Sequence, residues 1–329
     1  MSIDLIISQF SRNLFRGRRI LVTGGAGFLG SWLCEALTML GANVTCLDNL
    51  STGRVENIIQ LKNYENFKFI KADVSEYHPK GFDFIVYGAS LPSPDDYVMR
   101  PVETMLPNSI GLLNCLEAAR DGAGVLYMST SEVYGDAEVI PTREDYWGRV
   151  NPVGLRSCYD ESKRFGEALC MAYHRQYAVD VRIARIFNIY GPKLDPESKY
   201  ARVIPRFIMQ ALRNEPITIH GDGMQTRSFT YVTDTVNALI RMIVNDNVRG
   251  EVVNIGSQDE VSIMDLAKMI IRLTGSSSKI IFTKARPDDP RRRCPDISKA
   301  KKLLGWEPKT SLEDGLKYTI RWFMGRLNG

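Results

Sequence analysis

The sequence predicts an α/β protein built on a doubly wound parallel sheet, with a smaller α/β domain after it. Two observations support this fold class. Short apolar segments, typical of buried strands, alternate with longer amphipathic segments, typical of helices, through the first 187 residues. A glycine-rich turn joins the first of these strands to the first helix. After residue 188, prolines separate shorter segments, which indicates where the smaller domain begins.

The first domain is expected to contain six strands and three long helices. The strands are predicted at residues 19–23, 43–48, 67–71, 83–87, 124–129 and 180–187, and the helices at 28–40, 101–120 and 159–177. Right-handed crossovers between such strands give a parallel sheet whose ligands bind beyond the carboxyl ends of the strands. We expect residues 1–187 to form this domain, residues 188–329 to form mainly the second, and residues 228–255 to pack back onto the first.

Composition excludes several classes of function. A net charge of +4 over 329 residues, with scattered basic residues, gives little support for nucleic-acid binding. The densest basic run, Arg291–Arg293, lies beside Asp288 and Asp289 and indicates a small-anion site or a solvated face. Six cysteines without a Cys-x-x-Cys pair and three distant histidines predict no metal site, and thiols in a reducing compartment. No apolar run is long enough for a bilayer, so we expect a cytoplasmic protein without a membrane partner.

The glycine turn follows the strand 19–23 directly and leads into the helix 28–40. Gly24, Gly27 and Gly30 are spaced three apart. They allow a tight turn, close approach of the backbone to a pyrophosphate, and close packing of helix on strand, while the helix N-terminus attracts the phosphates. A glycine cluster alone could be a flexible loop, but its place between strand and helix favours a Rossmann-type dinucleotide site. We therefore expect Gly24, Gly27, Phe28 and Leu29 to contact the cofactor.

Acidic residues end the next two strands. Asp48, at the tip of strand 43–48, can accept hydrogen bonds from an adenosine ribose and repel a 2′-phosphate, which favours NAD over NADP. A solvated loop aspartate is the alternative, and Arg54 leaves that alternative open. Asp73 follows strand 67–71, where it could meet the adenine or only cap the following turn. Their neighbours Asn49 and Val74 are expected at the same site.

Tyr159 and Lys163 are four residues apart on a predicted helix and therefore share a face. A nearby ammonium favours the phenolate, so we expect the pKa of Tyr159 to be lowered. The phenolate would be a base able to take a proton from a sugar hydroxyl near neutral pH. Such a pair occurs by chance on many helices. The glycine turn earlier in the chain is what makes a catalytic role for this pair the better interpretation.

A cluster of polar side chains ends the strand 124–129. Thr130, Ser131 and Glu132 follow it directly. Residues of this kind could simply cap the next turn. Because the same edge of the sheet must hold the nicotinamide and Tyr159, a role toward the substrate is the better interpretation.

Together these motifs resemble the extended short-chain dehydrogenase/reductase family, whose members act on nucleotide sugars. The similarity extends from about Arg18 over nearly the whole chain. Five stretches are most similar to the UDP-glucuronate decarboxylases of that family: residues 89–97, 129–132, 156–161, 225–227 and 288–296. The chain departs from the decarboxylase pattern at four places, with Ser162 for glycine, Cys294 for lysine, Leu155 for proline and Tyr87-Gly88 for His-Leu.

The resemblance implies an NAD-dependent decarboxylation of UDP-glucuronate to UDP-xylose through a 4-keto sugar. It implies catalytic roles for Thr130 or Ser131, Glu132, Tyr159, Lys163 and Arg293. It also implies contacts of the substrate with Pro92, Tyr97, Glu132, Tyr159, Asn188, Arg227 and Arg293. For Arg227, a surface salt bridge is the alternative. The family pairs helices such as 101–120 and 159–177 into a homodimer.

Two rival interpretations remain open. A nucleotide-hexose 4,6-dehydratase of the same family would use Glu132 to take the C5 proton, whereas 4-epimerases usually lack a carboxylate at this position. Glu132 therefore argues against the epimerase more strongly than against the dehydratase. A non-catalytic NAD-binding sensor, from a different class, should lack Tyr159 or Lys163, and this chain has both.

Overall fold

The computed structural model describes residues 3–194, 202–285 and 291–327. Asp288 and Asp289, named above beside the basic run, lie outside the described residues, and so does the first part of the stretch 288–296.

The core of the molecule is a parallel sheet, which confirms the predicted fold class. Within the described residues it has seven strands in the order β11-β6-β5-β4-β1-β2-β3, and every pairing in it is parallel. The predicted strands occur within one residue of their expected ends, as β1 (Arg19–Thr23), β2 (Asn43–Asp48), β3 (Phe67–Lys71), β4 (Phe84–Tyr87), β5 (Gly124–Thr130) and β6 (Val181–Ile186). The seventh strand, β11 (Val252–Ile255), pairs with β6.

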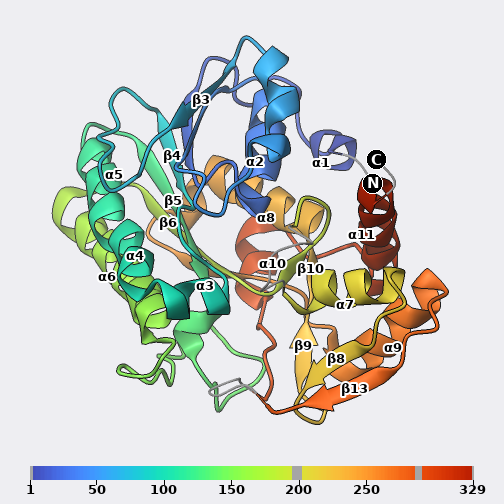
Figure 1. Cartoon of the computed structure of the whole chain (residues 1–329). Helices are drawn as coiled ribbons and strands as arrows, with labels where there is room; N and C mark the ends of the chain where they lie inside the picture. The colour runs from blue at the N-terminus through green and yellow to red at the C-terminus, as the bar shows by residue number, and fades with distance from the viewer. Residues whose placement is uncertain (1–2, 195–201, 286–290, 328–329) are drawn as a thin grey trace.

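Helices cover both faces of the sheet because its strands are apolar on both sides. Ile20 and Val22 of β1 pack into one core with α2 and α8, whereas Leu21 faces the other core, with α5 and α6. Figure 1 shows these layers on either side of the strands. The helices are α1 (Asp4–Ile7), α2 (Phe28–Met39), α3 (Pro94–Met99), α4 (Pro101–Leu106), α5 (Leu112–Ala119), α6 (Ser157–Tyr177) and α8 (Val232–Val244).

The long helix predicted at 101–120 contains a π-helical turn, Pro107–Gly111, between α4 and α5. Pro107 has no backbone N–H to donate, so the regular helical ladder is interrupted there. Its carbonyl accepts a hydrogen bond from the Tyr87 hydroxyl. At Gly111 a Cβ atom would lie 2.8 Å from the same hydroxyl and 2.6 Å from Val74, so the sheet approaches the helix closely at this turn.

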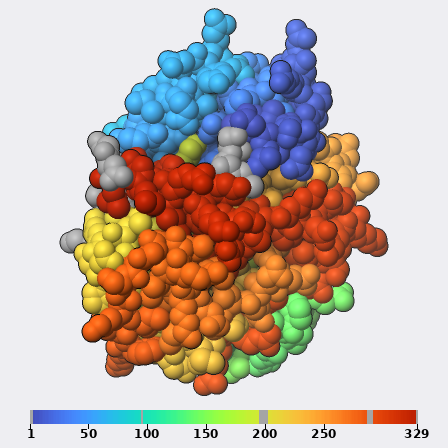
Figure 2. Space-filling view, turned by 90° about the vertical axis from the view of Figure 1, so that its right-hand side faces the viewer, coloured from blue at the N-terminus to red at the C-terminus, as the bar shows by residue number. Residues whose placement is uncertain are grey.

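A smaller α/β unit lies beyond the carboxyl ends of the strands (Figure 1). It contains three short strand pairs: β7 (Ile189–Tyr190) with β10 (Thr230–Tyr231), β8 (Ile217–His220) with β13 (Ile280–Thr283), and β9 (Thr226–Ser228) with β12 (Glu260–Ser262). Its helices are α7 (Val203–Leu212), α9 (Ile263–Thr274), α10 (Ser298–Leu304) and α11 (Leu312–Leu327). Figure 2 shows the C-terminal residues, in red, lying between the N-terminal residues in blue and the yellow and orange part of the second unit.

Single-turn 3₁₀ helices complete the secondary structure: Val55–Asn57, Ile59–Asn63, Ser131–Tyr134 and Asp246–Val248. In the described parts of the chain, no helix has both the length and the apolar character needed to cross a membrane.

Candidate active site

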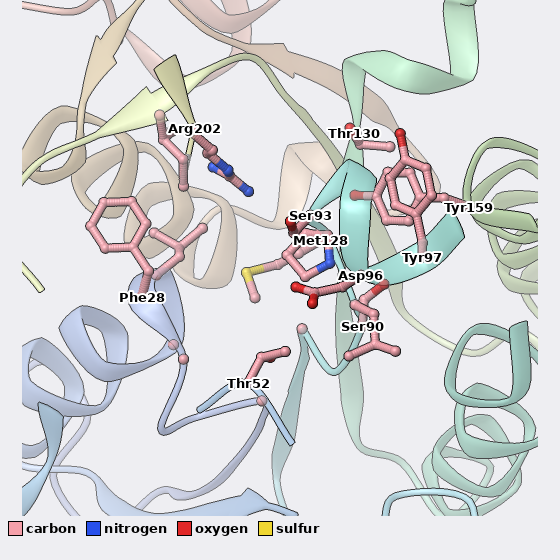
Figure 3. Close-up of a pocket in the computed structure, with 18 of the residues that line it drawn as sticks. Phe28, Thr52, Ser90, Ser93, Asp96, Tyr97, Met128, Thr130, Tyr159 and Arg202 are labelled. Carbon is pink, nitrogen blue, oxygen red and sulfur yellow. The ribbon is translucent and has the colours of Figure 1, made fainter. Parts of the chain in front are cut away.

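A cavity of about 840 Å³ opens at the carboxyl ends of the parallel strands, where ligands of such sheets bind. One wall consists of the glycine turn and the residues that follow β2, β3, β4 and β5, and the other comes from the second unit. Figure 3 shows Arg202, at the start of α7, facing Tyr97 and Tyr159 across the cavity, with Phe28 from the glycine-turn wall on the same side of the view as Arg202. The predicted cofactor and substrate residues line this cavity, and Ser131, Glu132, Asn188 and Arg293 are among them.

The glycine turn forms a cradle that side chains would fill. Gly24 has a positive φ of 67°, and a Cβ there would lie 2.8 Å from the carbonyl oxygen of Gly88. A Cβ on Gly30 would lie 2.1 Å from the Gly24 oxygen, so the first turn of α2 packs directly on the loop. Because Gly27, at the N-cap of α2, gives no side-chain cap, the helix N-terminus faces the cavity as backbone. This arrangement fits the pyrophosphate of a dinucleotide.

Asp48 holds the two loops that form the adenosine side of the cavity. Its carboxylate accepts hydrogen bonds from the backbone N–H of Ala26 at 2.9 Å and of Leu50 at 2.8 Å. Burial raises the pKa of Asp48. Asp48 lies in the cavity wall, where the predicted contact with a bound ribose would be made. Only 8% of the residue is exposed, so it is not a solvated loop residue.

Asp73 faces Asn49 across the same end of the cavity. The Asn49 amide donates to one Asp73 oxygen at 2.7 Å, and the backbone N–H of Ser75 donates to the other at 2.8 Å. The second bond is the turn cap that the sequence left open as an alternative. Although burial raises the pKa of Asp73, these hydrogen bonds outweigh it and lower the pKa overall.

The electrostatic expectation for Tyr159 is wrong in this structure. The Lys163 ammonium donates to the Met128 carbonyl at 2.9 Å and lies 4.9 Å from the centre of the Tyr127 ring. Burial raises the pKa of Tyr159 to about 12, although a hydrogen bond with Thr130 acts against it. Burial also lowers the pKa of Lys163 to about 7. The two residues share a face of α6, but burial is the largest cause of both pKa shifts, and Lys163 is not among the groups that shift the pKa of Tyr159.

Tyr97 lies against Tyr159 from α3. The two rings stack with centroids 5.1 Å apart and an angle of 5° between their planes. The thiol of Cys158 donates to the Tyr97 carbonyl oxygen at 3.3 Å, which ties α3 to the start of α6. Among the described residues, the buried Tyr97 hydroxyl has no hydrogen-bond partner. Figure 3 shows both rings at the side of the cavity that also holds Thr130.

Thr130 has two roles. Its hydroxyl accepts the backbone N–H of Glu132 at 3.2 Å, so it caps the 3₁₀ turn after β5, as the alternative interpretation expected. It also bonds with the Tyr159 side chain. The turn therefore places Thr130 beside Tyr159 and directs Glu132 toward the second unit.

Glu132 is held by two arginines from distant parts of the chain. Arg293 binds it with both terminal nitrogens, one of them at 2.8 Å, and Arg156 donates to it at 2.5 Å. Burial alone would raise the pKa of Glu132, but the two guanidinium groups lower it to about 2. Glu132 is therefore an anion whose lone pairs are engaged. Arg293, expected to meet the substrate, is bidentate to this carboxylate.

Asn188 and Arg227, the two residues expected to bind the nucleotide, are held by hydrogen bonds to backbone carbonyls of β9. The Asn188 amide donates to the Ser228 carbonyl at 3.3 Å, and Arg227 donates to the Thr226 carbonyl at 2.8 Å. Both line the cavity, as does Pro92 on the opposite wall. Arg227 is buried, with 8% of the residue exposed.

The sequence alone indicates no role for Arg156, Asp160 or Arg202. Arg202 precedes α7, and Figure 3 shows its guanidinium directed into the cavity. Burial lowers its pKa, and no hydrogen bond or ion pair joins its side chain to another described residue. Arg156 belongs to a stretch that carried the family resemblance, but only the folded chain brings it to Glu132. No local signal in the sequence marks Arg202.

The described residues contain no cluster of histidine, cysteine and acidic side chains that could hold a metal ion. All six cysteines are buried and free.

Comparisons with known proteins agree with this geometry. The profile of the NAD dependent epimerase/dehydratase family matches residues 20–256. UDP-glucuronic acid decarboxylase 1 of Xenopus tropicalis is 49% identical over 311 residues, 94% of this chain and 73% of that protein. UDP-glucuronic acid decarboxylase 4 of Arabidopsis thaliana is 47% identical over 94% of this chain and 70% of its own length. The structure of UDP-glucuronic acid 4-epimerase from Bacillus cereus with UDP-glucuronic acid and NAD superposes with a TM-score of 0.84, at 32% identity, covering 94% of this chain and 99% of that one.

Proposed function

This chain belongs to the NAD-dependent epimerase/dehydratase family, and on that premise we propose that it decarboxylates UDP-glucuronate to UDP-xylose. The substrate is a UDP-sugar and the cofactor is NAD, which is regenerated in each turnover. The observation that carries the choice of a uronate is the cluster at Glu132, where two guanidinium groups, that of the buried Arg293 and that of the half-buried Arg156, face one carboxylate. Its surplus positive charge suits a substrate that brings a carboxylate of its own. The relatives named as decarboxylases support the same choice.

Tyr159 is proposed as the group that removes the proton from the C4 hydroxyl. Thr130, already bonded to Tyr159, would hydrogen-bond the same oxygen and hold it in a reactive position. The glycine cradle and Asp48 would hold NAD, which would supply reversible hydride transfer at C4. Lys163, buried behind Tyr159 against the Met128 carbonyl, would hold that part of the site in place.

Loss of carbon dioxide follows from the chemistry of the oxidised sugar. With a ketone at C4 and a carboxylate at C6, the sugar is a β-keto acid, so the C5–C6 bond can break with its electrons passing to the C4 oxygen. The protonated Tyr159 phenol would donate a hydrogen bond to that developing enolate. Protonation at C5 and reduction at C4 then give UDP-xylose. Glu132 and Arg293 are proposed to position the sugar during these steps.

The state of Glu132 favours decarboxylation over the dehydratase alternative. A 4,6-dehydratase needs a base to take the C5 proton. A carboxylate bound by two arginines, with its pKa lowered to about 2, is a weak proton acceptor. Decarboxylation needs no base at C5, because the electrons that carbanion formation requires come from the bond to the departing carboxylate.

One assay tests the proposed function. The NAD-loaded protein is incubated with UDP-glucuronate and, separately, with UDP-glucose, and the products are identified by mass. We expect UDP-pentose and carbon dioxide from the first and no product from the second. A 4-keto-6-deoxy product from UDP-glucose would contradict the proposal and support the dehydratase.

Cofactor preference is expected to depend on the charge of Asp48. A 2′-phosphate placed beside this buried carboxylate would be repelled by about 1–4 kcal/mol, so NADP should support turnover at least about fivefold less well than NAD. Asp48→Asn removes the charge and retains an acceptor oxygen, so it should reduce the ratio of kcat/KM with NAD to kcat/KM with NADP. Equal kcat/KM with NAD and NADP in the wild-type protein would show that this role of Asp48 is wrong.

We also propose a homodimer formed by the helices 101–119 and α6. Their outer surface exposes large apolar side chains that soluble monomers seldom gather: Val102, Met105, Ile110, Leu113 and Phe165. Paired across a two-fold axis, these helices would cover one another. Light scattering after gel filtration should give a molar mass of twice the chain mass for the wild-type protein. Phe165→Glu should lower the measured mass toward that of one chain. A wild-type monomer at micromolar concentration would contradict the proposal.

A further inference from the structure

Asp160 lies one residue beyond Tyr159 on α6 and is buried behind the Glu132 cluster. One of its carboxylate oxygens lies 3.9 Å from the Arg156 Nε. The other is buried, and no described residue forms a hydrogen bond with it. Arg156 therefore stands between two carboxylates, with a 2.5 Å bond to Glu132 and a looser ion pair with Asp160. A buried carboxylate with an unsatisfied oxygen is costly when ionised.

Among the ion-paired residues of this cluster, Glu132, Arg156, Arg293 and Asp160, the charges balance only when Asp160 is ionised. Arg156 and Arg293 carry two positive charges and Glu132 carries one negative charge, which leaves one positive charge over. An ionised Asp160 cancels it, and a protonated Asp160 leaves it available. Burial, followed by the negative charge of Glu132, raises the pKa of Asp160 to about 7, so both states are accessible near neutral pH.

The other acidic groups near Asp160 already form ion pairs of their own. Glu161, next on α6, pairs with Arg164. On α4, which packs on α6, Glu103 pairs with Arg100. Three neutral groups lie beside Asp160, with pKa values raised by burial: Tyr97, Cys158 and Tyr159. Lys163, on the next turn of α6, is bonded to the Met128 carbonyl on the sheet side.

We propose that binding of a UDP-uronate is coupled to the uptake of one proton at Asp160. The substrate carboxylate then takes the place of the Asp160 carboxylate as the counter-charge of Arg156 and Arg293. Two carboxylates sharing one surplus positive charge in a buried site would repel each other, and protonation of Asp160 removes that repulsion. Asp160 is thus a positioning residue that acts through Arg156. The inference rests on the proposed function, because only a uronate brings the second carboxylate.

The linkage fixes the direction of the pH dependence. Below pH 7 Asp160 is already protonated in the free protein, so the binding of UDP-glucuronate is accompanied by little proton uptake. Above pH 7 the free site has lost that proton and must regain it, so the affinity for UDP-glucuronate should fall by up to about tenfold for each pH unit. UDP-xylose has no carboxylate, and its affinity should stay constant across the same range.

Titration calorimetry in two buffers of different ionisation enthalpy counts the protons taken up. The NAD-loaded Tyr159→Phe variant serves as the parent protein, because it is expected to bind UDP-glucuronate without converting it. At pH 8 we expect an uptake close to one proton with UDP-glucuronate and close to none with UDP-xylose. No uptake with UDP-glucuronate would overturn the proposal.

Asp160→Asn in that parent should abolish the uptake and make UDP-glucuronate binding independent of pH. It should also bind UDP-glucuronate more tightly than the parent at pH 8, with the affinity for UDP-xylose unchanged. Glu161→Gln, which removes the charge of the half-buried neighbouring acid that pairs with Arg164, is the matched control and should keep the linkage. Proton uptake that persists in Asp160→Asn would overturn the assignment to Asp160.

Infrared difference spectra provide a second measurement that needs no substitution at Asp160. UDP-glucuronate added to the parent at pH 8 should produce the carbonyl band of a protonated carboxylic acid, shifted by ¹³C-aspartate labelling. Absence of a labelled band would overturn the proposal. Formation of UDP-pentose by the wild-type protein is a separate result, so the proposed function can stand if this linkage fails.

Discussion

Tyr159→Phe is expected to lower kcat by about 10²–10⁴-fold, the usual contribution of a positioned acid–base group. Phenylalanine keeps the ring that stacks on Tyr97 and removes only the hydroxyl that bonds with Thr130. The variant should therefore fold and retain NAD, and addition of UDP-glucuronate should produce no NADH absorbance. Turnover within a few fold of wild type would rule out Tyr159 as the base.

The raised pKa of Tyr159 gives this prediction a second readout. The phenolate is the form that accepts the C4 proton, and its fraction increases with pH up to the pKa. The wild-type kcat should therefore rise with pH across the neutral range. The residual rate of Tyr159→Phe should lose that rise, because the titrating group is gone. A rise of the same size in the variant would assign the pH dependence to another group.

Sequence reasoning located the features of the site that depend on neighbouring residues. The glycine turn, Asp48 and the Thr130–Glu132 segment each follow a strand whose end is visible in the alternation of apolar segments. Because all strands of the sheet are parallel, those ends lie at one edge of the sheet. Fold class and cavity position could therefore be predicted together.

Features that depend on packing between distant segments could not be predicted. Glu132 and Arg293 are 161 residues apart, and their bidentate pair forms only when the second unit closes over the sheet. Helical spacing shows that Lys163 and Tyr159 share a face, and on that basis the sequence predicts that Lys163 lowers the pKa of Tyr159. The spacing does not show how deeply both groups are buried, and burial decides the direction of both pKa shifts.

Arg293→Ala is expected to weaken UDP-glucuronate binding by about 30-fold, or about 2 kcal/mol, while UDP-glucose binding changes little. Without Arg293 the cluster keeps one guanidinium for the Glu132 carboxylate, so no surplus positive charge remains for a uronate. The pKa of Glu132 should rise toward its ordinary value because Arg293, the larger of the two guanidinium contributions, is lost. Binding is measured by calorimetry with both ligands, in the Tyr159→Phe background.

Arg292→Ala is the matched control for this prediction. Arg292 is the adjacent residue, but it is exposed and pairs with Glu260 instead of Glu132. Its removal should leave both affinities unchanged, so a selective loss in Arg293→Ala would come from the buried cluster and not from the basic run as a whole. Because breaking a buried ion pair can cost about 3–5 kcal/mol of folding stability, NAD content and thermal unfolding must be compared first.

The pattern across the two ligands decides between the candidate functions. A loss confined to UDP-glucuronate means that Arg293 senses the C6 carboxylate, as a decarboxylase requires. An equal loss with UDP-glucose would instead place Arg293 with the diphosphate, which both ligands share. The charge of the Glu132 cluster would then no longer distinguish a uronate from a hexose, and the 4,6-dehydratase would be as well supported by the geometry as the decarboxylase.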